Sequence, residues 1–396
     1  MSTDSSLAYV SFDSVPAAKG AAVHISAFSR SLARAFGTLD LVTVAGSDTA
    51  VGPDLRPDGV RHTALPALGT NLIGRALHFR ARLAALWQGR RFTAVQFRSI
   101  FEGFPIVQGR RERCDRLVFE VNGLPSIELK YRYPRSEEDR TLMAKIRAQE
   151  HFCLMAADLV ITPSAVTAEY LQSLGVSGGR LRVIPNGVDL ECFSYRPPQP
   201  AIDGPMRLVY FGTLAPWQGV ELAVRALARL PFAAHLELVG HGSHRQVQFL
   251  RRLADKLHVG ERVHFAGSLS QSALVARLHA SDAVVAPFAL CDRNLVQGCC
   301  PLKVLEGMAS GTPVVSTDLP VVRALGADGE HLLLARPGSV DALVEALTAL
   351  RTNPALGTGL ARAARRRIEE HFTWEQAGRA LVEAYTALGI QPVSRF

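Results

Sequence analysis

One stretch, residues 283–318, constrains the fold more than any other part of the chain. It reads AVVAPFALCDRNLVQGCCPLKVLEGMASGTPVVSTD. The apolar run Ala283–Phe288 and a second one from Val314 predict buried strands, and the turn residues 311–313 separate the second run from what precedes it. A helix should begin at Pro301 between them, because proline is tolerated at the first helical position. This succession of strand, helix and strand predicts an α/β fold with a parallel sheet.

The helix expected from Pro301 has an apolar arc and an opposite polar arc. Lys303, Glu306, Gly307 and Ser310 are spaced so that they share the polar arc. A cation beside the free N–H groups of a helix N-terminus suits a diphosphate. A carboxylate one turn later suits the paired hydroxyls of a ribose. We therefore predict that Lys303 binds phosphate and Glu306 binds ribose; the alternative is a crossover helix with a solvated polar side.

The length and composition of the chain indicate a globular protein of more than one domain. At 396 residues the chain exceeds one typical core, and its hydrophobic content of 48% is that of a protein with a sizeable interior. No apolar run reaches the roughly 18 residues that span a bilayer, and the first residues lack a signal pattern. We expect a cytoplasmic protein, with membrane association as an alternative. The six cysteines show no zinc or disulfide spacing.

The net charge of +8 is concentrated in an arginine-rich segment, residues 75–116. A basic first half is compatible with nucleic acid, an anionic membrane or anionic substrates. The arginines follow no helix-turn-helix or RNA-binding pattern, so nucleic acid is not a predicted partner. Peripheral membrane contact through a basic N-terminal domain and a plain solvated basic face both remain open.

Strand and helix signals alternate along the whole chain and restart after a linker-like segment, Ser194–Pro205. We therefore predict two doubly wound α/β domains, residues 1–195 and 196–370. Residues 371–396 form a final helical segment.

Six segments then resemble, in order, the motifs of the retaining glycosyltransferases of family 4, which have the GT-B fold. The segments are VIPNGVD at 183–189, LVYFGTL at 208–214 followed by Gln218–Gly219, LVGHG at 238–242, VHFAG at 263–267, ASD at 280–282, and PLK at 301–303 with EGMA at 306–309. The resemblance implies two Rossmann-like domains facing a central cleft, the first binding the acceptor and the second the nucleotide-sugar donor. It also implies that the C-terminal helix returns to the N-terminal domain.

The resemblance assigns donor contacts to particular positions. Glu306 matches the glutamate that binds the donor ribose, and Gly20, after Lys19, matches the glycine of a loop that closes on the diphosphate. The remaining implied contacts are the backbone of Cys300, Pro301 and Leu302 for sugar and phosphate, Gly240 in a glycine turn, and Ala266, Gly267 and Leu269 around the nucleobase.

The chain departs from the family pattern at the residues that usually bind the diphosphate. The usual arginine and lysine fall on Thr213 and Gln218, and a usual glutamate falls on Gly298. Losing one contact to developing charge commonly costs about 3–4 kcal/mol, so another cation should replace them. We predict that Lys303 does so, with Arg293 or Lys19 as alternatives.

Acceptor-side candidates lie in the first half of the chain. Glu120 ends an apolar strand run, where α/β folds place ligand contacts, and Asn122 follows in a turn. These two stand where relatives often have a histidine. His24 lies one helical turn beyond the first loop. Residues 125–134 are expected to be an acceptor loop or a plain surface connection.

Together with these residues, the resemblance implies a retaining glycosyltransferase that moves a sugar from a UDP- or GDP-sugar to an acceptor hydroxyl. The acceptor would be a sugar, a lipid-linked molecule or a small molecule, in polysaccharide, glycolipid or secondary-metabolite biosynthesis. The predicted catalytic residues are Lys303, Glu306 and Glu120. No metal or cofactor is expected, because no paired aspartates of the metal-binding type are evident. The alternative is a catalytically weak GT-B scaffold that binds a nucleotide sugar or a partner protein, motivated by Thr213, Gln218 and Gly298.

Overall fold

The computed structural model describes residues 6–17, 19–46, 58–133, 136, 138–199 and 203–393. The chain forms two compact units. Unit 1 comprises residues 1–185 and 375–396, and unit 2 comprises residues 186–374. Unit 2 begins ahead of the division that the composition suggests at residue 195. The amide of Asn186 donates to the Cys300 carbonyl at 2.7 Å, and Val188 pairs with Thr373, so this segment packs on unit 2.

Unit 1 contains a seven-stranded sheet with strand order β3-β2-β1-β4-β5-β6-β7. All its strand pairs are parallel. A sheet covered on both faces needs apolar residues on both sides of each strand, and β2, for instance, is buried throughout. The strands are β1 (Leu7–Ser14), β2 (Leu39–Val44), β3 (Val60–Leu65), β4 (Phe92–Phe97), β5 (Cys114–Glu120), β6 (Leu159–Thr162) and β7 (Leu181–Val183).

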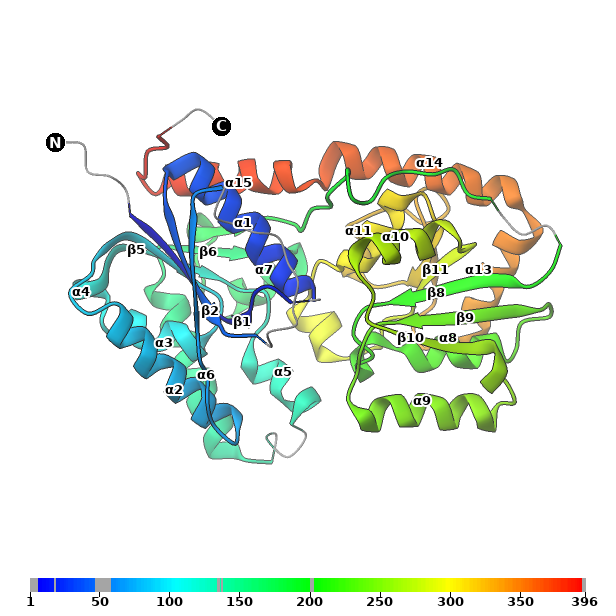
Figure 1. Ribbon diagram of the computed structural model, residues 1–396, viewed down its shortest axis with the longest axis horizontal. Helices are drawn as coiled ribbons and strands as arrows, with labels where there is room; N and C mark the ends of the chain where they lie inside the picture. The colour runs from blue at the N-terminus through cyan, green and yellow to red at the C-terminus, as the bar shows by residue number, and fades with distance from the viewer. Residues whose placement is uncertain are drawn as a thin grey trace. The chain divides into compact units, whose positions relative to one another are not determined.

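The helices of unit 1 include the last helix of the chain, α15. Figure 1 draws α15, in red, beside α1, in blue, and the rings of Phe36 and Tyr385 join them at 5.6 Å. On α2, α3 and α6, apolar side chains pack into the core of the sheet. The helices are α1 (Gly20–Phe36), α2 (Leu72–Leu86), α3 (Ile100–Gln108), α4 (Arg110–Arg113), α5 (Pro125–Arg132), α6 (Arg140–Ala156), α7 (Ala165–Ser173) and α15 (Trp374–Ala387), with a 3-10 turn at Gly178–Arg180.

The segment from Pro125, expected to be a loop, is the helix α5. Proline occupies its first turn, where its missing N–H costs nothing. The buried carboxylate of Glu150 accepts a hydrogen bond from the Ser126 N–H at 2.8 Å and so satisfies another free donor of the helix start. The loop prediction is therefore wrong for the described residues of this segment.

Unit 2 contains a six-stranded parallel sheet with strand order β10-β9-β8-β11-β12-β13. The strands are β8 (Met206–Phe211), β9 (Ala234–Val239), β10 (Val263–Gly267), β11 (Ala283–Ala286), β12 (Val314–Thr317) and β13 (Leu333–Ala335). The helices are α8 (Val220–Leu227), α9 (His244–Lys256), α10 (Gln271–His279), α11 (Leu302–Ser310), α12 (Pro320–Arg323), α13 (Val340–Thr352) and α14 (Pro354–His371). Short turns of 3-10 helix lie at Pro216–Gln218 and Gly260–Arg262, and a π-helical turn lies at Arg293–Gln297.

The helix α11 is packed more deeply than its polar arc suggests. Gly307 faces the sheet so closely that a Cβ atom there would lie 2.9 Å from the Val314 side chain and 3.2 Å from that of Val284. Ser310 and Lys303 are also buried. The alternative of a crossover helix with a solvated polar side is therefore wrong for three of its four polar-arc residues; Glu306 alone is half-buried.

Each sheet reverses its strand order once, between β1 and β4 in unit 1 and between β8 and β11 in unit 2. In open parallel sheets, ligands bind beyond the carboxyl ends of the strands at such a switch point. The fold thus singles out two places in the molecule for functional side chains.

Candidate functional site

At the switch point of unit 2, three elements bring polar groups together. Lys303, from the first turn of α11, donates from Nζ to the Tyr210 hydroxyl at 2.8 Å and to Gln218 Oε1 at 2.6 Å. Tyr210 lies near the end of β8 and donates its own hydroxyl proton to the Thr213 carbonyl at 2.6 Å. The structure therefore joins Lys303 directly to Gln218, and it joins Lys303 to Thr213 through a tyrosine that the sequence reasoning missed.

The ammonium group of Lys303 is buried among neutral groups. The side chain is 8% exposed, and Nζ lies 4.0 Å from the ring centroid of Tyr210 and 5.2 Å from that of Phe288. Among the residues described, it has no ion-pair partner. Burial lowers the pKa of Lys303 well below its usual range, and Arg293 lowers it further, against opposing effects of Cys299 and Glu306. A buried cation with neutral partners is stabilised by an anionic ligand.

The N-terminus of α11 adds hydrogen-bond donors at the same place. Pro301 is the N-cap residue, no side chain caps the helix, and its first turn has no acidic residue. The first N–H groups of a helix without a side-chain cap favour an anion. Cys300, next to the cap, is held through its carbonyl by Asn186. The predicted backbone contacts at Cys300, Pro301 and Leu302 therefore adjoin the Lys303 ammonium.

Glu306 lies one turn after Lys303 on α11 and is half-buried. Burial raises the pKa of its carboxyl to about 7, and Lys303 opposes this shift. Both protonation states are therefore accessible near neutral pH. Its contact with a ribose stays a prediction.

Of the other predicted donor residues, Lys19 and Gly20 lie in unit 1, and the rest lie on neighbouring loops of unit 2. Gly240, after β9, donates its N–H to the Gly267 carbonyl at 2.7 Å and has φ +134°; a Cβ there would lie 2.0 Å from the Gly212 carbonyl oxygen, so only glycine fits. Ala266, Gly267 and Leu269 lie at the end of β10 and in the loop after it, with β9 between β10 and the strand that carries Tyr210. Arg293 stacks its guanidinium over Trp217 at 5.4 Å.

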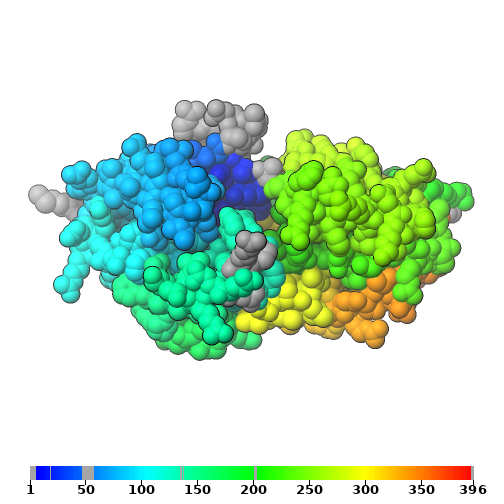
Figure 2. Space-filling view, turned by 90° about the horizontal axis from the view of Figure 1, so that it is seen from below, coloured from blue at the N-terminus to red at the C-terminus, as the bar shows by residue number. Residues whose placement is uncertain are grey.

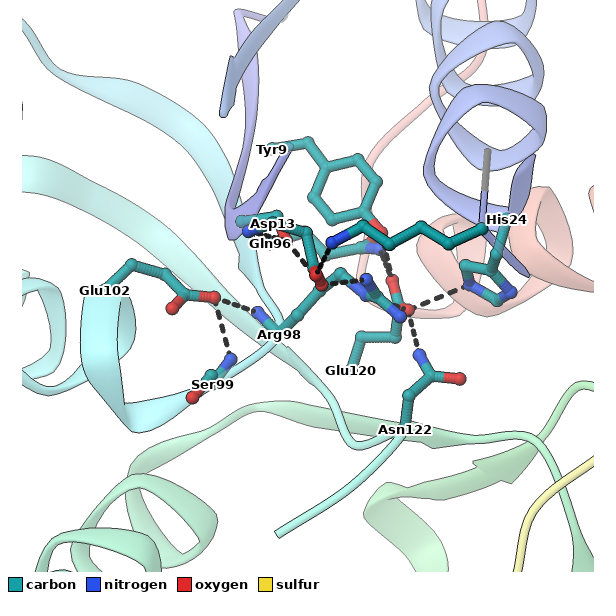
Figure 3. A network of polar contacts seen from close by, with 11 residues as sticks. Tyr9, Asp13, His24, Gln96, Arg98, Ser99, Glu102, Glu120 and Asn122 are labelled. Carbon is teal, nitrogen blue, oxygen red and sulfur yellow. Dashed lines mark hydrogen bonds and ion pairs between the residues drawn. The ribbon is translucent and has the colours of Figure 1, made fainter. Parts of the chain in front are cut away.

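At the switch point of unit 1, Glu120 is the centre of a buried network (Figure 3). Its Oε2 accepts from the Tyr9 hydroxyl at 2.5 Å and from Gln96 Nε2 at 2.6 Å. Its Oε1 accepts from Arg98 Nε at 2.8 Å and lies 2.8 Å from His24 Nε2. The Asn122 side-chain amide also donates to Oε1.

Glu120 is thus 1% exposed and contacts five donor groups. Burial by itself raises the pKa of a carboxyl, but His24 and Arg98, with the hydrogen bonds from His24 and Tyr9, hold the pKa of Glu120 well below its usual range. A carboxylate in this state is a poor proton acceptor. Glu120 holds the side chains of His24 and Asn122 in place, and the catalytic role predicted for it stays a prediction.

The network reaches outward through Asp13 and Arg98. Arg98 Nη1 contacts Asp13 Oδ2 at 3.0 Å, and Lys19 Nζ contacts Asp13 Oδ1 at 3.0 Å. Burial raises the pKa of Asp13, but Arg98 and Lys19 outweigh it, and the pKa is lowered. Lys19 is also the N-cap residue of α1, which starts at Gly20 and has no acidic residue in its first turn. Lys19, His24, Glu120 and Asn122 therefore share one network.

The sequence reasoning missed the strand residues of this network. Tyr9, Asp13, Gln96 and Arg98 lie in or directly after β1 and β4, the strands on either side of the switch point. Polar residues at the carboxyl end of an otherwise apolar strand were the signal that identified Glu120, and the same signal applies to Gln96 and Arg98.

Two findings concern metals and membranes. The described part of the chain contains no group of three or more His, Cys, Asp or Glu side chains arranged to hold a metal ion. None of its helices is both long enough and apolar enough to cross a bilayer. On α2, Ile73 and Leu77 are exposed, and Figure 2 shows this light-blue region at the surface of unit 1. Peripheral membrane contact through the basic N-terminal domain stays a prediction.

Two Rossmann-like parallel sheets, each with charged groups at its switch point, define a protein of the GT-B class. Comparison with solved structures shows this fold. Sucrose-phosphate synthase from Thermosynechococcus elongatus superposes with a TM-score of 0.81 at 22% sequence identity, covering 97% of this chain and 99% of that one. HepE from Anabaena, in complex with UDP-glucose, gives 0.76 at 17% identity, covering 96% and 99%.

Sequence comparison shows the family. The model of "Glycosyltransferase Family 4" matches residues 18–192, and that of "Glycosyl transferases group 1" matches residues 205–353. The chain belongs to these glycosyltransferases. The glycogen synthase of Mycobacterium tuberculosis is 30% identical over 250 residues, which are 62% of this chain and 58% of that protein. The MMP alpha-(1->4)-mannosyltransferase of Mycolicibacterium hassiacum is 29% identical over 246 residues, 61% of this chain and 56% of that protein. The match therefore spans less than two thirds of either relative.

Proposed function

We propose that this glycosyltransferase transfers a sugar from a UDP- or GDP-sugar to an acceptor hydroxyl, with retention of configuration and without a metal ion. The acceptor is a sugar, a lipid-linked molecule or a small molecule, in polysaccharide, glycolipid or secondary-metabolite biosynthesis. One observation carries the proposal: the Lys303 ammonium is buried beside the uncapped N-terminus of α11 with neutral hydrogen-bond partners. A diphosphate provides the charge that this arrangement lacks.

In this mechanism Lys303 and the first N–H groups of α11 stabilise the leaving diphosphate. Negative charge grows on the diphosphate as the glycosidic bond breaks, and these groups are already oriented toward it. The acceptor hydroxyl attacks the sugar from the face that the diphosphate leaves. Its proton passes to a phosphate oxygen, so no carboxylate base is needed. Glu306 holds the ribose.

Gln218 and Tyr210 position the Lys303 ammonium. The family lysine is absent at position 218, but Lys303 Nζ lies 2.6 Å from the Gln218 side chain. Lys303 therefore places its charge beside the position that lacks it. The crystal structure of HepE with UDP-glucose supports a uridine nucleotide as the first donor to test.

The second candidate function is a catalytically weak scaffold that binds a nucleotide sugar or a partner protein. Its support is that Thr213, Gln218 and Gly298 are all uncharged. A scaffold of this kind binds nucleotide but releases no nucleoside diphosphate from a nucleotide sugar when acceptors are supplied.

The experiment that tests the proposal combines binding and turnover. Thermal shift with UDP, GDP and ADP identifies the nucleotide, because a ligand that binds only the folded state raises the Tm. Release of that nucleoside diphosphate from its sugar is then measured with a panel of acceptors. Lys303→Met should lower kcat/KM about 100- to 1000-fold. Glu306→Gln should weaken nucleotide binding about tenfold.

Lys256→Met, at the exposed end of α9, is the matched control and should leave both quantities unchanged. Unaltered kinetics in both Lys303→Met and Glu306→Gln would place the donor elsewhere. Nucleotide binding without turnover for any acceptor would favour the scaffold.

A further inference from the structure

The Asn122 side chain is oriented by the network around Glu120. Its amide nitrogen donates to Glu120 Oε1, and an ionised carboxylate only accepts hydrogen bonds, so the nitrogen must face Glu120. Figure 3 shows the Asn122 amide oxygen pointing away from Glu120. The side chain is half-buried, and its oxygen accepts no hydrogen bond from the described residues. An oriented amide oxygen of this kind is suited to accept a hydrogen bond from a sugar hydroxyl.

On its other side, the same carboxylate is linked through Gln96 to a residue of the last helix. Gln96 Nε2 donates to Glu120 Oε2 at 2.6 Å, while Gln96 Oε1 accepts from the Tyr385 hydroxyl at 2.6 Å. Tyr385 is 1% exposed and lies on α15. A tyrosine hydroxyl that donates to Gln96 Oε1 fixes which end of the Gln96 amide faces Glu120. Three side chains therefore connect α15 to Asn122.

We propose that Asn122 binds a hydroxyl of the acceptor sugar through its amide oxygen, and that Tyr385, through Gln96 and Glu120, is a positioning residue for that contact. The part of this inference that concerns the acceptor sugar rests on the proposed function. It assigns the returning helix a part in acceptor recognition. It also gives Glu120 the role of an anchor, which agrees with the five donor groups around its carboxylate.

The connection from Tyr385 to Asn122 runs through two buried residues. Glu120 and Gln96 are 1% and 0% exposed. If the Tyr385 hydroxyl is removed, Gln96 Oε1 loses its donor; Gln96 Nε2 still faces the carboxylate of Glu120, but the amide is then held at one end only, and the Glu120 carboxylate shifts with it. The hydrogen bond from the Asn122 amide to Glu120 Oε1 is then weaker, and the amide oxygen of Asn122 is less precisely placed.

The test is a cycle of single and double variants in the full-length protein. Asn122→Ala should raise the acceptor KM about tenfold, and Tyr385→Phe about threefold. The Kd for UDP should be unchanged in both. The double variant should show the KM of Asn122→Ala alone, because Tyr385 acts only through Asn122. Tyr170→Phe is the control, since its hydroxyl on α7 has no hydrogen bond to the described residues.

Two results overturn the proposal: an unchanged acceptor KM in Tyr385→Phe, or effects of the two substitutions that multiply in the double variant. The second result means that Tyr385 acts on stability or elsewhere. If Tyr385→Phe folds poorly, Gln96→Leu interrupts the same connection between Tyr385 and Asn122. Its acceptor KM should then rise about threefold, against about tenfold for Asn122→Ala.

An activity-independent measurement separates this inference from the proposed function. In protein labelled with 15N-asparagine, the Asn122 side-chain amide signal is assigned by its loss in Asn122→Asp. It should shift in Tyr385→Phe and stay in place in Tyr170→Phe; an unshifted signal refutes the positioning role. A wild-type protein that transfers no sugar refutes the proposed function, and with it the acceptor contact, whatever the amide signal does.

Discussion

In unit 1 the buried carboxylate of Glu120 is surrounded by five donor groups, whereas in unit 2 the buried ammonium of Lys303 contacts two neutral oxygen atoms and two aromatic rings. Both groups lie at the switch point of a parallel sheet. The partners of Glu120 complete its hydrogen bonding within the protein. The partners of Lys303 hold it in place but do not neutralise it.

This difference distinguishes a structural charge from a ligand-binding charge. A buried ion that is fully paired stabilises a local arrangement, and removing its charge leaves its buried partners without an interaction. A buried ion with neutral partners costs stability in the free protein, and a ligand of opposite charge recovers that cost. Position in the fold alone does not separate the two cases. The count and charge of the partners do.

The largest expected effect is on stability, in Glu120→Gln. The amide has one acceptor oxygen where the carboxylate has two, and its NH₂ group faces other donors. We expect a loss of about 3–5 kcal/mol in the free energy of unfolding, measured with urea at pH 7. Glu112→Gln, on the exposed side of α4, is the control and should change it by less than about 0.5 kcal/mol. An equally small loss in Glu120→Gln would remove the contrast between the two units.

A smaller effect of opposite sign is expected for Lys303→Met. Methionine keeps the shape and removes a buried charge, so stability should rise by about 1–2 kcal/mol at pH 7. The folded-state pKa of Lys303 is lowered, so the unfolded chain binds more protons and wild-type stability should rise with pH above neutrality. This rise should be smaller in the variant, in urea titrations at pH 7 and 9. A loss of stability in Lys303→Met would mean that the ammonium is satisfied within the protein.

The smallest expected effect concerns Glu102, the third helical residue of α3. Its Oε1 accepts from the N–H groups of Arg98 and Ser99 at 3.0 and 2.8 Å, and burial raises its pKa to about 8 despite these bonds. The pKa is higher in the folded than in the unfolded state. Its contribution to stability is therefore present below about pH 4.5 and is lost as the pH rises to about 8.

Glu102→Gln keeps the oxygen that accepts both N–H groups and does not titrate. We expect the variant to lose about 1 kcal/mol less stability than the wild type between pH 6 and pH 7. Unfolding by urea at three pH values measures this difference. Parallel pH curves for the two proteins would show that Glu102 is ionised in the folded state across this range.

The order of elements was predictable because it depends on local patterns. The apolar runs and turns of unit 2 predicted β11, β12 and α11, and the spacing of Lys303 and Glu306 placed them on one side of a helix. The strand β3 was missed because its sequence, VRHTAL, mixes polar and apolar residues. The helix α3 was missed because it contains Pro105.

The networks were not predictable because their contacts are distant in the sequence. The pair Tyr385–Gln96 spans 289 residues, and the pair Lys303–Tyr210 spans 93. Strand-end position indicated Glu120, but nothing local to it indicates that five donor groups surround it. The burial of Lys303 depends in the same way on residues from β8 and the loops around it.

The inclusion of α15 in unit 1 has a consequence for synthesis. Unit 2 is a continuous stretch, residues 186–374, whereas unit 1 is interrupted by it. Because the hydroxyl of Tyr385 reaches Gln96, the interior of unit 1 lacks a hydrogen-bond donor until α15, which follows the whole of unit 2 in the chain, has left the ribosome. Unit 1 is therefore translated first but completes its folding after unit 2.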